Sequence, residues 1–478
     1  MSFDSDVCRC LPLADATLHI LDFVADPSFL GDLYARHRGR SYEKVIAFAD
    51  LVHLMADALV VNGQSAHRTF QQARADGQMS ASVKAVYDKI ARLPVELSAA
   101  LLTEGTVRLR GLLPDAPTEP VPASLAGFTP LTFDGKKIKY VARRLKSVRS
   151  VRGQVIGGKM LVAEDVRTGL AVALEADPDG EASDLALVPG LLARVRAVVA
   201  GIRLWIGDAL FCDLIHLAML AADGDHFVVR YNAKVKFHPD PEKPATTGVN
   251  TRGQTYTEEW GWLGGPKDER RRYVRRITVH RPDDEDVSVV TDLIDGDTYP
   301  AADILDMYLR RWGIERLFQK ATEVFHLQAL VSARANGTVF QAALCLLLYN
   351  LTVVVRAYVA AGAKRKVADV SLEKLFVDVC RQLTGLIEVI GVPAVVAHYA
   401  DGNWTAECLR SYLNRVLGAT WRDWWKKSPP RKKSKPTPTE YLVGGHSSVY
   451  KIVRGLHRTV PEPKPEPQTD DPTRPSKQ

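Results

Sequence analysis

Hydrophobic residues recur every three or four positions in two stretches near the start of the chain, residues 42–59 and 82–102. This spacing predicts amphipathic helices, and little of the alternation typical of strands occurs before residue 115. A proline-rich stretch follows, with Pro114, Pro117, Pro120, Pro122 and Pro130. Because proline interrupts regular elements, we expect a boundary here, after a helical N-terminal domain over residues 1–115.

The pattern changes from residue 131 onward to short apolar runs separated by longer amphipathic stretches. The short runs predict strands at residues 131–133, 159–165, 169–176, 203–206 and 226–230. The longer stretches predict helices at residues 183–199 and 214–222. This order of elements predicts an α/β layer in which helices pack on a mixed sheet.

A different pattern occupies residues 232–300, where short alternating runs at 256–263, 273–280 and 287–292 are separated by Gly, Pro and Asp turns. We interpret it as a β-rich insertion in the α/β layer. Helical patterns resume at residue 302 and continue into a C-terminal helical region, residues 361–420. Residues 421–478 form a basic, Pro-rich tail, and beyond residue 460 the composition predicts disorder.

The composition of the 478 residues, 46% hydrophobic and 25% charged, is that of a soluble globular protein. A net charge of +7 favours a polyanionic partner without requiring one. Six cysteines form no disulfide or zinc pattern. The apolar stretch 342–355 contains Asn350 and Thr352 and is too short to span a bilayer, so we expect a core helix, no membrane partner and a cytoplasmic protein.

Two aspartates follow predicted strands, Asp134 in Thr-Phe-Asp-Gly-Lys-Lys and Asp208 in Leu-Trp-Ile-Gly-Asp. The chemistry of α/β sheets is commonly placed at strand ends, and a neighbouring glycine lets a ligand approach. Ordinary turn chemistry explains each Asp-Gly pair equally simply. The two aspartates are therefore candidates for catalysis, with a structural role as the alternative.

A third acidic residue lies where helices resume, in Tyr-Leu-Arg-Arg-Trp-Gly-Ile-Glu-Arg-Leu-Phe-Gln-Lys. Spacings of three and four residues put Tyr308, Arg311 and Glu315 on one face of a helix. A surface Arg–Glu pair would have the same spacing. The position of the motif, downstream of Asp134 and Asp208, favours a common site.

Together these motifs resemble the DDE transposases of insertion-sequence family four, whose glutamate helix carries Tyr, two residues, Arg, three residues, Glu, six residues, Lys. Tyr308, Arg311 and Glu315 match, but Thr322 stands at the lysine position and the nearest lysine is Lys320. The family often has arginine after the second aspartate, where this chain has Ala209. The resemblance covers roughly residues 125–360.

The resemblance implies an α/β fold with an RNase H-like mixed-sheet catalytic core, formed by residues 125–231 and 301–360. It also implies that Asp134, Asp208 and Glu315 are catalytic metal ligands. We expect Asp134 to bridge two Mg ions, for which Mn can substitute, with Asp208 on one ion and Glu315 on the other. Carboxylate oxygens suit Mg, and two ions roughly 3.5–4 Å apart serve phosphodiester chemistry.

Double-stranded DNA is the implied partner, both the ends of the element and the target, with a homodimer pairing two ends. In the family, water cuts the end, the freed 3′-OH forms a hairpin, and after reopening it attacks the target. Tyr308 and Arg311 would hold phosphates. Further candidate DNA contacts are Gln319, Lys320, Arg230, Lys234, Lys236, Arg272 and Arg275. Three aromatic residues of the insertion are either base-stacking or strand residues: Tyr256, Trp260 and Trp262.

Two alternatives keep the same residues but change the activity. The first is a catalytically inactive DNA-binding relative, a repressor or architectural protein, which the missing motif lysine allows. The second is an RNase H-like nuclease that hydrolyses DNA without joining strands. A sugar hydrolase using paired carboxylates has no support beyond scattered aromatic residues. For any of the DNA-acting functions we expect a nucleoid-associated protein in the bacterial cytoplasm, and the N-terminal domain is the candidate for binding the DNA ends.

Overall fold

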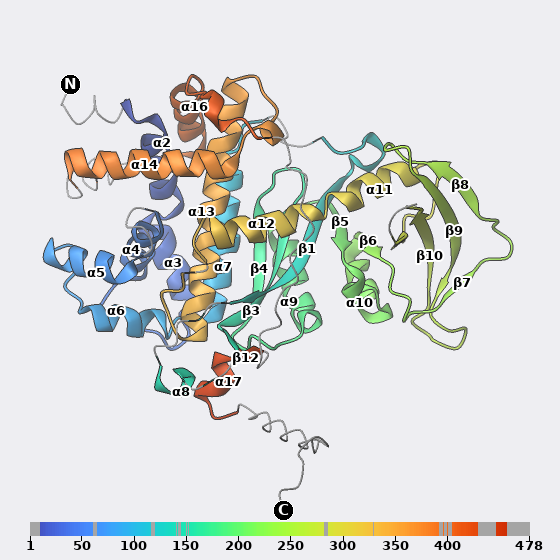
Figure 1. The fold of residues 1–478 in the computed structure, drawn as a ribbon, viewed down its shortest axis with the longest axis horizontal. Helices are drawn as coiled ribbons and strands as arrows, with labels where there is room; N and C mark the ends of the chain where they lie inside the picture. The colour runs from blue at the N-terminus through green and yellow to red at the C-terminus, as the bar shows by residue number, and fades with distance from the viewer. Residues whose placement is uncertain are drawn as a thin grey trace, which may run out of the picture.

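Two halves of the molecule meet at one long helix, α13 (Ala335–Gly362), in the computed structural model (Figure 1). One half consists of helices and the other is built on a β-sheet. The structure describes residues 10–60, 65–115, 120–139, 141, 145–149, 151, 153–281, 285–327, 329–391, 395, 399, 404–428 and 446–456. The disorder expected beyond residue 460 lies outside these residues.

The helical half contains the amphipathic helices predicted near the start of the chain. They are α2 (Pro12–Val24), α3 (Pro27–His37), α4 (Phe48–Val60), α5 (Ala66–Ala75), α6 (Val83–Ile90) and α7 (Val95–Arg110). Side chains cap several of them at the N-terminus: Asp26 accepts a hydrogen bond from Phe29 N–H, and Ser65 and Ser82 act in the same way. From the other end of the chain, α14 (Leu372–Ile390) and α16 (Ala406–Leu417) pack against α2.

The sheet half contains a mixed sheet whose strands run in the order β4-β3-β1-β5-β6-β11-β10-β9-β7, with β8 also paired to β9. The first five are β4 (Ala171–Asp177), β3 (Gly158–Asp165), β1 (Phe128–Ile138), β5 (Ile202–Gly207) and β6 (His226–Arg230). β1 is antiparallel to β3 and parallel to β5, and β5 is parallel to β6. This five-stranded layer confirms the expected α/β class with a mixed sheet.

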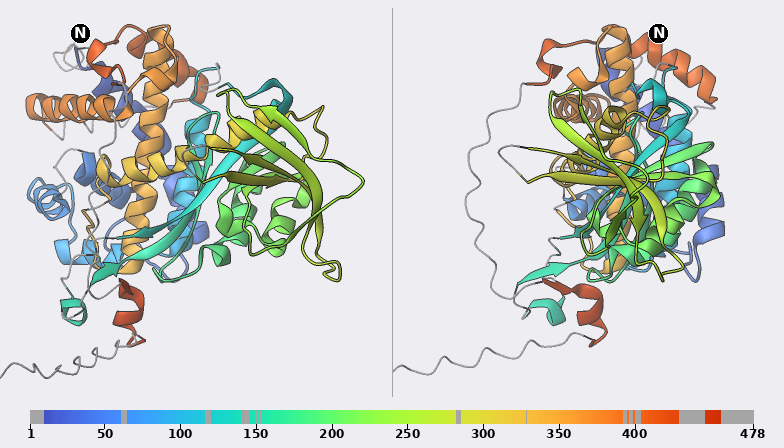
Figure 2. Two further views of the ribbon diagram at one scale, coloured as in Figure 1. Left: turned by 45° about the vertical axis from the view of Figure 1, so that its right-hand side comes forward. Right: turned by 90° about the vertical axis from the view of Figure 1, so that its right-hand side faces the viewer.

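The predicted insertion continues the same sheet instead of forming a separate one, because β11 pairs antiparallel with β6. Its strands are β7 (Phe237–Pro239), β8 (Thr246–Val249), β9 (Thr255–Leu263), β10 (Arg272–Val279) and β11 (Val287–Thr291). β7 and β8 were not predicted, because they are short and pair only at the edge of β9. Figure 2 shows the insertion extending from the five-stranded layer, away from the helical half.

Helices cover the five-stranded layer. α9 (Asp184–Val198) packs against β3 and β4, and α10 (Leu214–Leu220) lies next to α9 and β6. α11 (Ala301–Leu309) contacts β6, and α12 (Trp312–Glu323) crosses β1 and β3 toward α13 (Figure 1). The remaining small elements are α8 (Lys146–Arg149), α17 (Val449–Val453), the parallel pair β2 (Gln154–Ile156) and β12 (His446–Ser448), and 3-10 turns at Ala123–Leu125, Ala209–Phe211, Ala222–Gly224, Val367–Asp369 and Asp423–Trp425.

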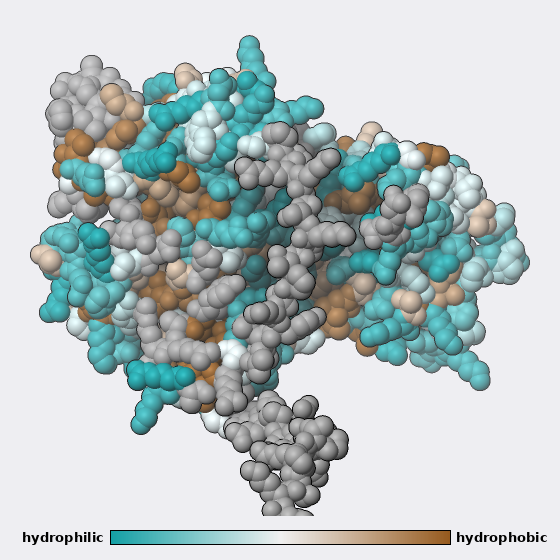
Figure 3. Space-filling model, viewed as in Figure 1, coloured by the Kyte–Doolittle hydropathy of each residue, from teal (hydrophilic) through white to brown (hydrophobic). Residues whose placement is uncertain are grey.

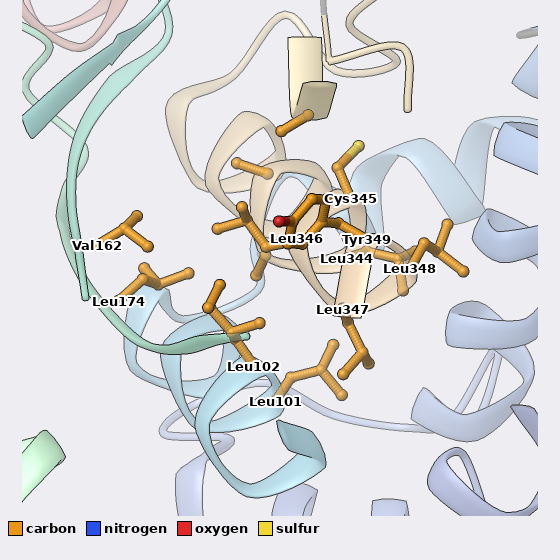
Figure 4. Packing of buried hydrophobic residues seen from close by; sticks show 14 of the residues in the cluster. Leu101, Leu102, Val162, Leu174, Leu344, Cys345, Leu346, Leu347, Leu348 and Tyr349 are labelled. Atoms are coloured by element: carbon orange, nitrogen blue, oxygen red, sulfur yellow. The ribbon is translucent and has the colours of Figure 1, made fainter. Parts of the chain in front are cut away.

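Helix α13 is the centre of the main core. Figure 4 shows its leucines packed between α7 and the strands β3 and β4. It is long and apolar enough to cross a membrane, but its most apolar stretch is entirely buried, which confirms the predicted core helix. Asn350 joins the layers: it accepts a hydrogen bond from Ala171 N–H and donates to Thr106 Oγ1 and Ala171 O. Its polar groups are therefore satisfied inside the core.

Candidate active site

The register of the sheet brings the two predicted aspartates to one place. The parallel pairing of β1 with β5 ends at Thr132 opposite Ile206. Asp134 and Asp208 each lie two residues beyond this pair, so continuing the register sets them opposite one another. We expected Asp134 to follow a short strand. Instead it lies inside the longer β1, where it is still paired with Val162 of β3. We call this candidate site, at the point where β1 separates from β5, the catalytic edge.

Asp134 is a partly buried carboxylate among charged neighbours. Burial raises its pKa to about 6. Two effects partly oppose this rise: a hydrogen bond of 2.8 Å that Gly135 N–H donates to Asp134, and the positive charge of Arg311. The negative charges of Asp208 and Glu315 raise the pKa further. The three acidic residues are therefore close enough to influence one another electrostatically.

Gly135 has a different role from the one expected. A side chain there would place its Cβ 1.8 Å from Asp184 Oδ1, at the first residue of α9. Asp184 in turn forms an ion pair of 2.8 Å with Lys159 of β3. Because alternate residues of a strand face opposite sides, Gly135 faces α9 while Asp134 faces the other side. The glycine is needed for helix packing and not for the approach of a ligand.

Asp208 begins the 3-10 turn after β5, and its side chain makes no capping hydrogen bond. Its Oδ1 atom is buried without a hydrogen-bond partner among the described residues. The charge of Asp208 also acts on Tyr308: burial raises the pKa of the Tyr308 hydroxyl, Arg311 opposes this rise, and Asp208 adds to it. A buried carboxylate oxygen without a donor is costly, so it marks a place for a ligand.

We expected the Tyr-Arg-Glu motif on one continuous helix. Instead it lies on two consecutive helices. Tyr308 is in the last turn of α11, Arg311 is the N-cap residue of α12, and Glu315 is in its first turn. The Arg311 guanidinium still reaches Glu315 across four residues, with Nη2 to Oε1 at 3.2 Å. Its Nη1 atom is 4.0 Å from Asp134 Oδ2.

Arg311 is the cation at the centre of the cluster. Its side chain is 8% exposed, and its Nε atom has no hydrogen-bond partner among the described residues. Burial lowers its pKa, but the negative charges of Asp208 and Glu315 help to raise it overall. One guanidinium therefore lies between three acidic side chains.

No group of three His, Cys, Asp or Glu residues within the described parts of the chain is arranged closely enough to hold a metal ion. The position of Arg311 gives a physical reason, because its guanidinium separates Asp134 from Glu315. The donor atoms themselves fit a hard divalent cation: all are carboxylate oxygens, and Asp208 Oδ1 has no partner.

Two of the predicted DNA contacts, Gln319 and Lys320 of α12, have neighbours other than the three acidic residues. Gln319 is exposed and donates a hydrogen bond of 3.0 Å to Glu323. Burial lowers the pKa of Lys320 to about 8, and the positive charge of Arg356 lowers it further. The negative charge of Glu164 partly opposes this fall in pKa. Lys320 therefore faces β3 and α13, away from the three acids, and does not replace the motif lysine. Thr322, at the lysine position, donates to Phe318 O.

Arg275 does not fit its expected role as a DNA contact. It is fully buried, and its Nε donates to Glu258 at 2.7 Å while Nη1 donates to Tyr299 O at 2.6 Å. Arg272 and Arg230 are half-buried at the ends of their strands, and Lys234 and Lys236 are exposed. Arg230 also acts electrostatically on Tyr308, which places it at the catalytic edge.

The aromatic residues of the insertion divide in the same way. Trp260 is buried and donates to Ile294 O, whereas Trp262 packs against Tyr273 and under Arg271. Trp312, which no sequence motif marks, follows Arg311 directly and is 55% exposed. Only the tertiary structure shows that this indole is exposed beside a buried arginine.

Part of the chain is similar to a known protein family. Residues 133–351 match a protein-family model described as the transposase DDE domain. No curated protein matches the chain. Among solved structures, the chain is similar to a piggyBac transposase synaptic complex with hairpin DNA, at 12% sequence identity and a TM-score of 0.42, over 89% of this chain and 87% of that chain.

The matched segment contains Asp134, Asp208 and Glu315 together with the β-insertion. Residues 133–351 are therefore similar to the DDE domain of transposases, a class of enzymes that cut and join DNA strands with divalent metal ions. The predicted class is confirmed, whereas the insertion-sequence family and the roles of single residues remain predictions.

Proposed function

We propose that the chain is the transposase of an insertion sequence related to family four, which cuts the ends of its element and joins them to target DNA. The proposal rests on one observation above all: the three acidic residues of the motif surround a single guanidinium at the catalytic edge. A protein that only binds DNA gains nothing from three carboxylates facing phosphate, because like charges repel.

Asp134, Asp208 and Glu315 would hold two Mg ions, or Mn in their place, with Asp134 bridging. Bound ions would supply the neutralising charge on the attacking and leaving oxygens of the phosphodiester. The protein contributes the oxygen ligands and a rigid frame, since Asp134 lies in a paired strand and Asp208 directly follows one. Glu315 comes from α12, so the position of that helix sets the geometry of the site.

Arg311 and Tyr308 would bind the phosphates next to the cleaved bond. The Arg311 guanidinium is prepared for this role because its Nε has no partner among the described residues and its other nitrogens face carboxylates. A guanidinium forms strong charge-assisted hydrogen bonds with phosphate oxygens. Arg230, Arg272, Lys234 and Lys236 would extend the contact along the DNA backbone.

The full reaction would be cut-and-paste transposition through a DNA hairpin. Water cuts one strand, the freed 3′-OH attacks the opposite strand, and the reopened end attacks the target. A homodimer would pair two element ends, with the N-terminal helical domain as the candidate for end recognition. Such an enzyme would act on the nucleoid in the bacterial cytoplasm.

The test is a cleavage assay on DNA that carries the terminal inverted repeats flanking the gene, with Mg or Mn. Asp134→Asn, Asp208→Asn and Glu315→Gln should each lower the cleavage rate by more than about 100-fold while leaving DNA binding intact. Asp306→Asn is the matched control, because Asp306 lies on α11 and, among the described residues, pairs with Arg310. Near-normal cleavage in any of the three variants would remove that residue from the metal site.

The products decide between the proposal and its alternatives. A labelled hairpin and a strand-transfer product support cut-and-paste transposition. Nicking without either product would favour a nuclease, and binding without nicking in both metals would favour a catalytically inactive relative.

A further inference from the structure

A second candidate site lies in the helical half, in a cavity of about 960 Å³. Its walls come from α2, α4 and α5 near the N-terminus and from α13 and α14 near the C-terminus. Figure 3 shows hydrophobic side chains along α14 on this face of the molecule. Ligand pockets typically measure roughly 300–1,000 Å³, so the cavity has the size of a binding site for a small molecule.

The charges that line this cavity all have one sign. Its described lining contains five acidic residues and neither lysine nor arginine; the acids are Asp22, Asp50, Asp57, Asp76 and Glu388. Among the described lining residues, His53 alone could carry a positive charge, but burial lowers its pKa, and its Nε2 atom contacts Ala25 O. In a DNA transposase with a net charge of +7, such a cavity repels phosphate and attracts cations.

Asp57 is the central group of this lining. It lies on α4, is partly buried, makes no hydrogen bond or ion pair within the described residues, and lines the cavity beside apolar side chains such as Leu54. Burial alone raises its pKa to about 6. A carboxylate in such surroundings is ionised at neutral pH without compensation, and a bound cation would supply it.

The remaining walls are apolar, with Leu21, Ile46, Met79, Leu351 and Leu383 among them. Several carboxylates spread over such walls match a ligand with several positive charges separated by hydrocarbon. Methylene chains lie along apolar surfaces while their charged ends reach acidic groups. A simple metal ion would leave the apolar walls without a partner, and a nucleotide would be repelled.

We propose that this cavity binds an aliphatic polyamine, with one ammonium group on Asp57 and another on Asp22 or Glu388. This site is separate from the catalytic edge in residues and in charge, and it does not depend on the proposed transposition reaction. The transposase would thereby respond to a cation that also binds DNA.

The test is isothermal titration calorimetry of the full chain with spermidine at pH 7.5, without DNA and at two salt concentrations. We expect one spermidine per chain, with binding that weakens as salt increases. Asp57→Asn should weaken binding by about tenfold or more, because it removes a charged partner at constant shape. Asp88→Asn is the matched control, since Asp88 is an exposed acid of α6 that pairs with Lys84 outside the cavity.

Three results would overturn the proposal. The first is the absence of binding to the unaltered protein. The second is equal binding by the unaltered protein and Asp57→Asn. The third is several weak sites that Asp57→Asn and Asp88→Asn weaken alike, because this shows surface association only. A lysine-rich amphipathic peptide that binds one to one where spermidine does not would also overturn it, by assigning the cavity to a protein segment.

A folding control accompanies the titration. The folded pKa of Asp57 lies above its ordinary value of 3.8, so its contribution to stability is greatest below that pH and is lost as the pH rises to about 6. Asp57→Asn should therefore unfold at a higher temperature than the unaltered protein at pH 7.5. If it fails to fold, Asp22→Asn serves as the second variant, since Asp22 also lines the cavity. Cleavage of DNA by either variant should be unchanged.

Discussion

The arginines of the catalytic edge and those of the β-insertion have opposite surroundings. In the insertion, Arg275 is paired with Glu258 and Arg276 with Glu259, and both pairs span neighbouring strands. At the catalytic edge, Arg311 has a buried Nε without a partner and Asp208 has a buried oxygen without one, among the described residues. Each insertion arginine has a carboxylate of its own, although Arg275 Nη2 is also buried without a partner among the described residues. Arg311 is instead shared between Glu315 and Asp134, and the free oxygen of Asp208 leaves this edge available to a ligand.

The largest effect on folding should come from the insertion. Arg275→Ala leaves Glu258 buried without its partner and should lower the free energy of unfolding by about 3–5 kcal/mol. Denaturant unfolding measures the change. Arg276→Ala is the control: its pair is about one-fifth exposed, so we expect a loss of roughly 1 kcal/mol or less. A stable Arg275→Ala protein with weakened DNA binding would contradict the structural role of this residue.

At the catalytic edge the expected effect is on binding. Arg311→Ala should weaken the complex with element-end DNA by about 10- to 100-fold, since charge-assisted hydrogen bonds contribute about 1.5–3 kcal/mol. A gel-shift titration measures it. Arg310→Ala is a neighbouring control, because Arg310 pairs with Asp306 on the surface of α11. Unchanged binding and cleavage would count against a phosphate role for Arg311.

A third variant tests the frame that positions Glu315. The Cβ of an alanine at position 313 would lie 2.9 Å from the buried carboxylate of Glu164. Gly313→Ala should therefore push α12 away from β3 and lower the free energy of unfolding by about 1–3 kcal/mol. Cleavage should fall with it. Gly265→Ala is the control, because a Cβ there meets nothing within 4 Å; equal stability of the two variants would contradict this packing role.

The smallest effect should come from an exposed cation of the insertion. Lys236→Ala should weaken DNA binding a few-fold and reduce the slope of binding against salt by about one, as expected when one phosphate contact is lost. Titrations at several salt concentrations measure the slope. Lys84→Ala, on the surface of α6, should leave it unchanged. An unchanged slope for Lys236→Ala would place this side chain away from the DNA.

Much of the five-stranded layer could be predicted because its signals are local. Alternating and periodic apolar residues predicted β3, β5, β6, α9 and α10 to within a few residues, and they also predicted the sheet-like insertion. The edge strands β7 and β8 were missed, since such short strands have little pattern of their own and depend on β9 for pairing. The sequence pattern also did not predict the break between α11 and α12. Arg310 and Arg311, which lie at the break, keep helical backbone angles, so the break is slight.

By itself, the sequence determined the kinds of chemistry present, from the three acidic residues to the motif around Arg311, because residue type and spacing are written in the chain. Only the tertiary structure decided which charges are satisfied. It buried Arg275 against Glu258, set Arg311 between Asp134 and Glu315, and left Asp57 in the cavity without a partner among the described residues. Burial and pairing depend on contacts between residues far apart in the chain, so no local pattern records them.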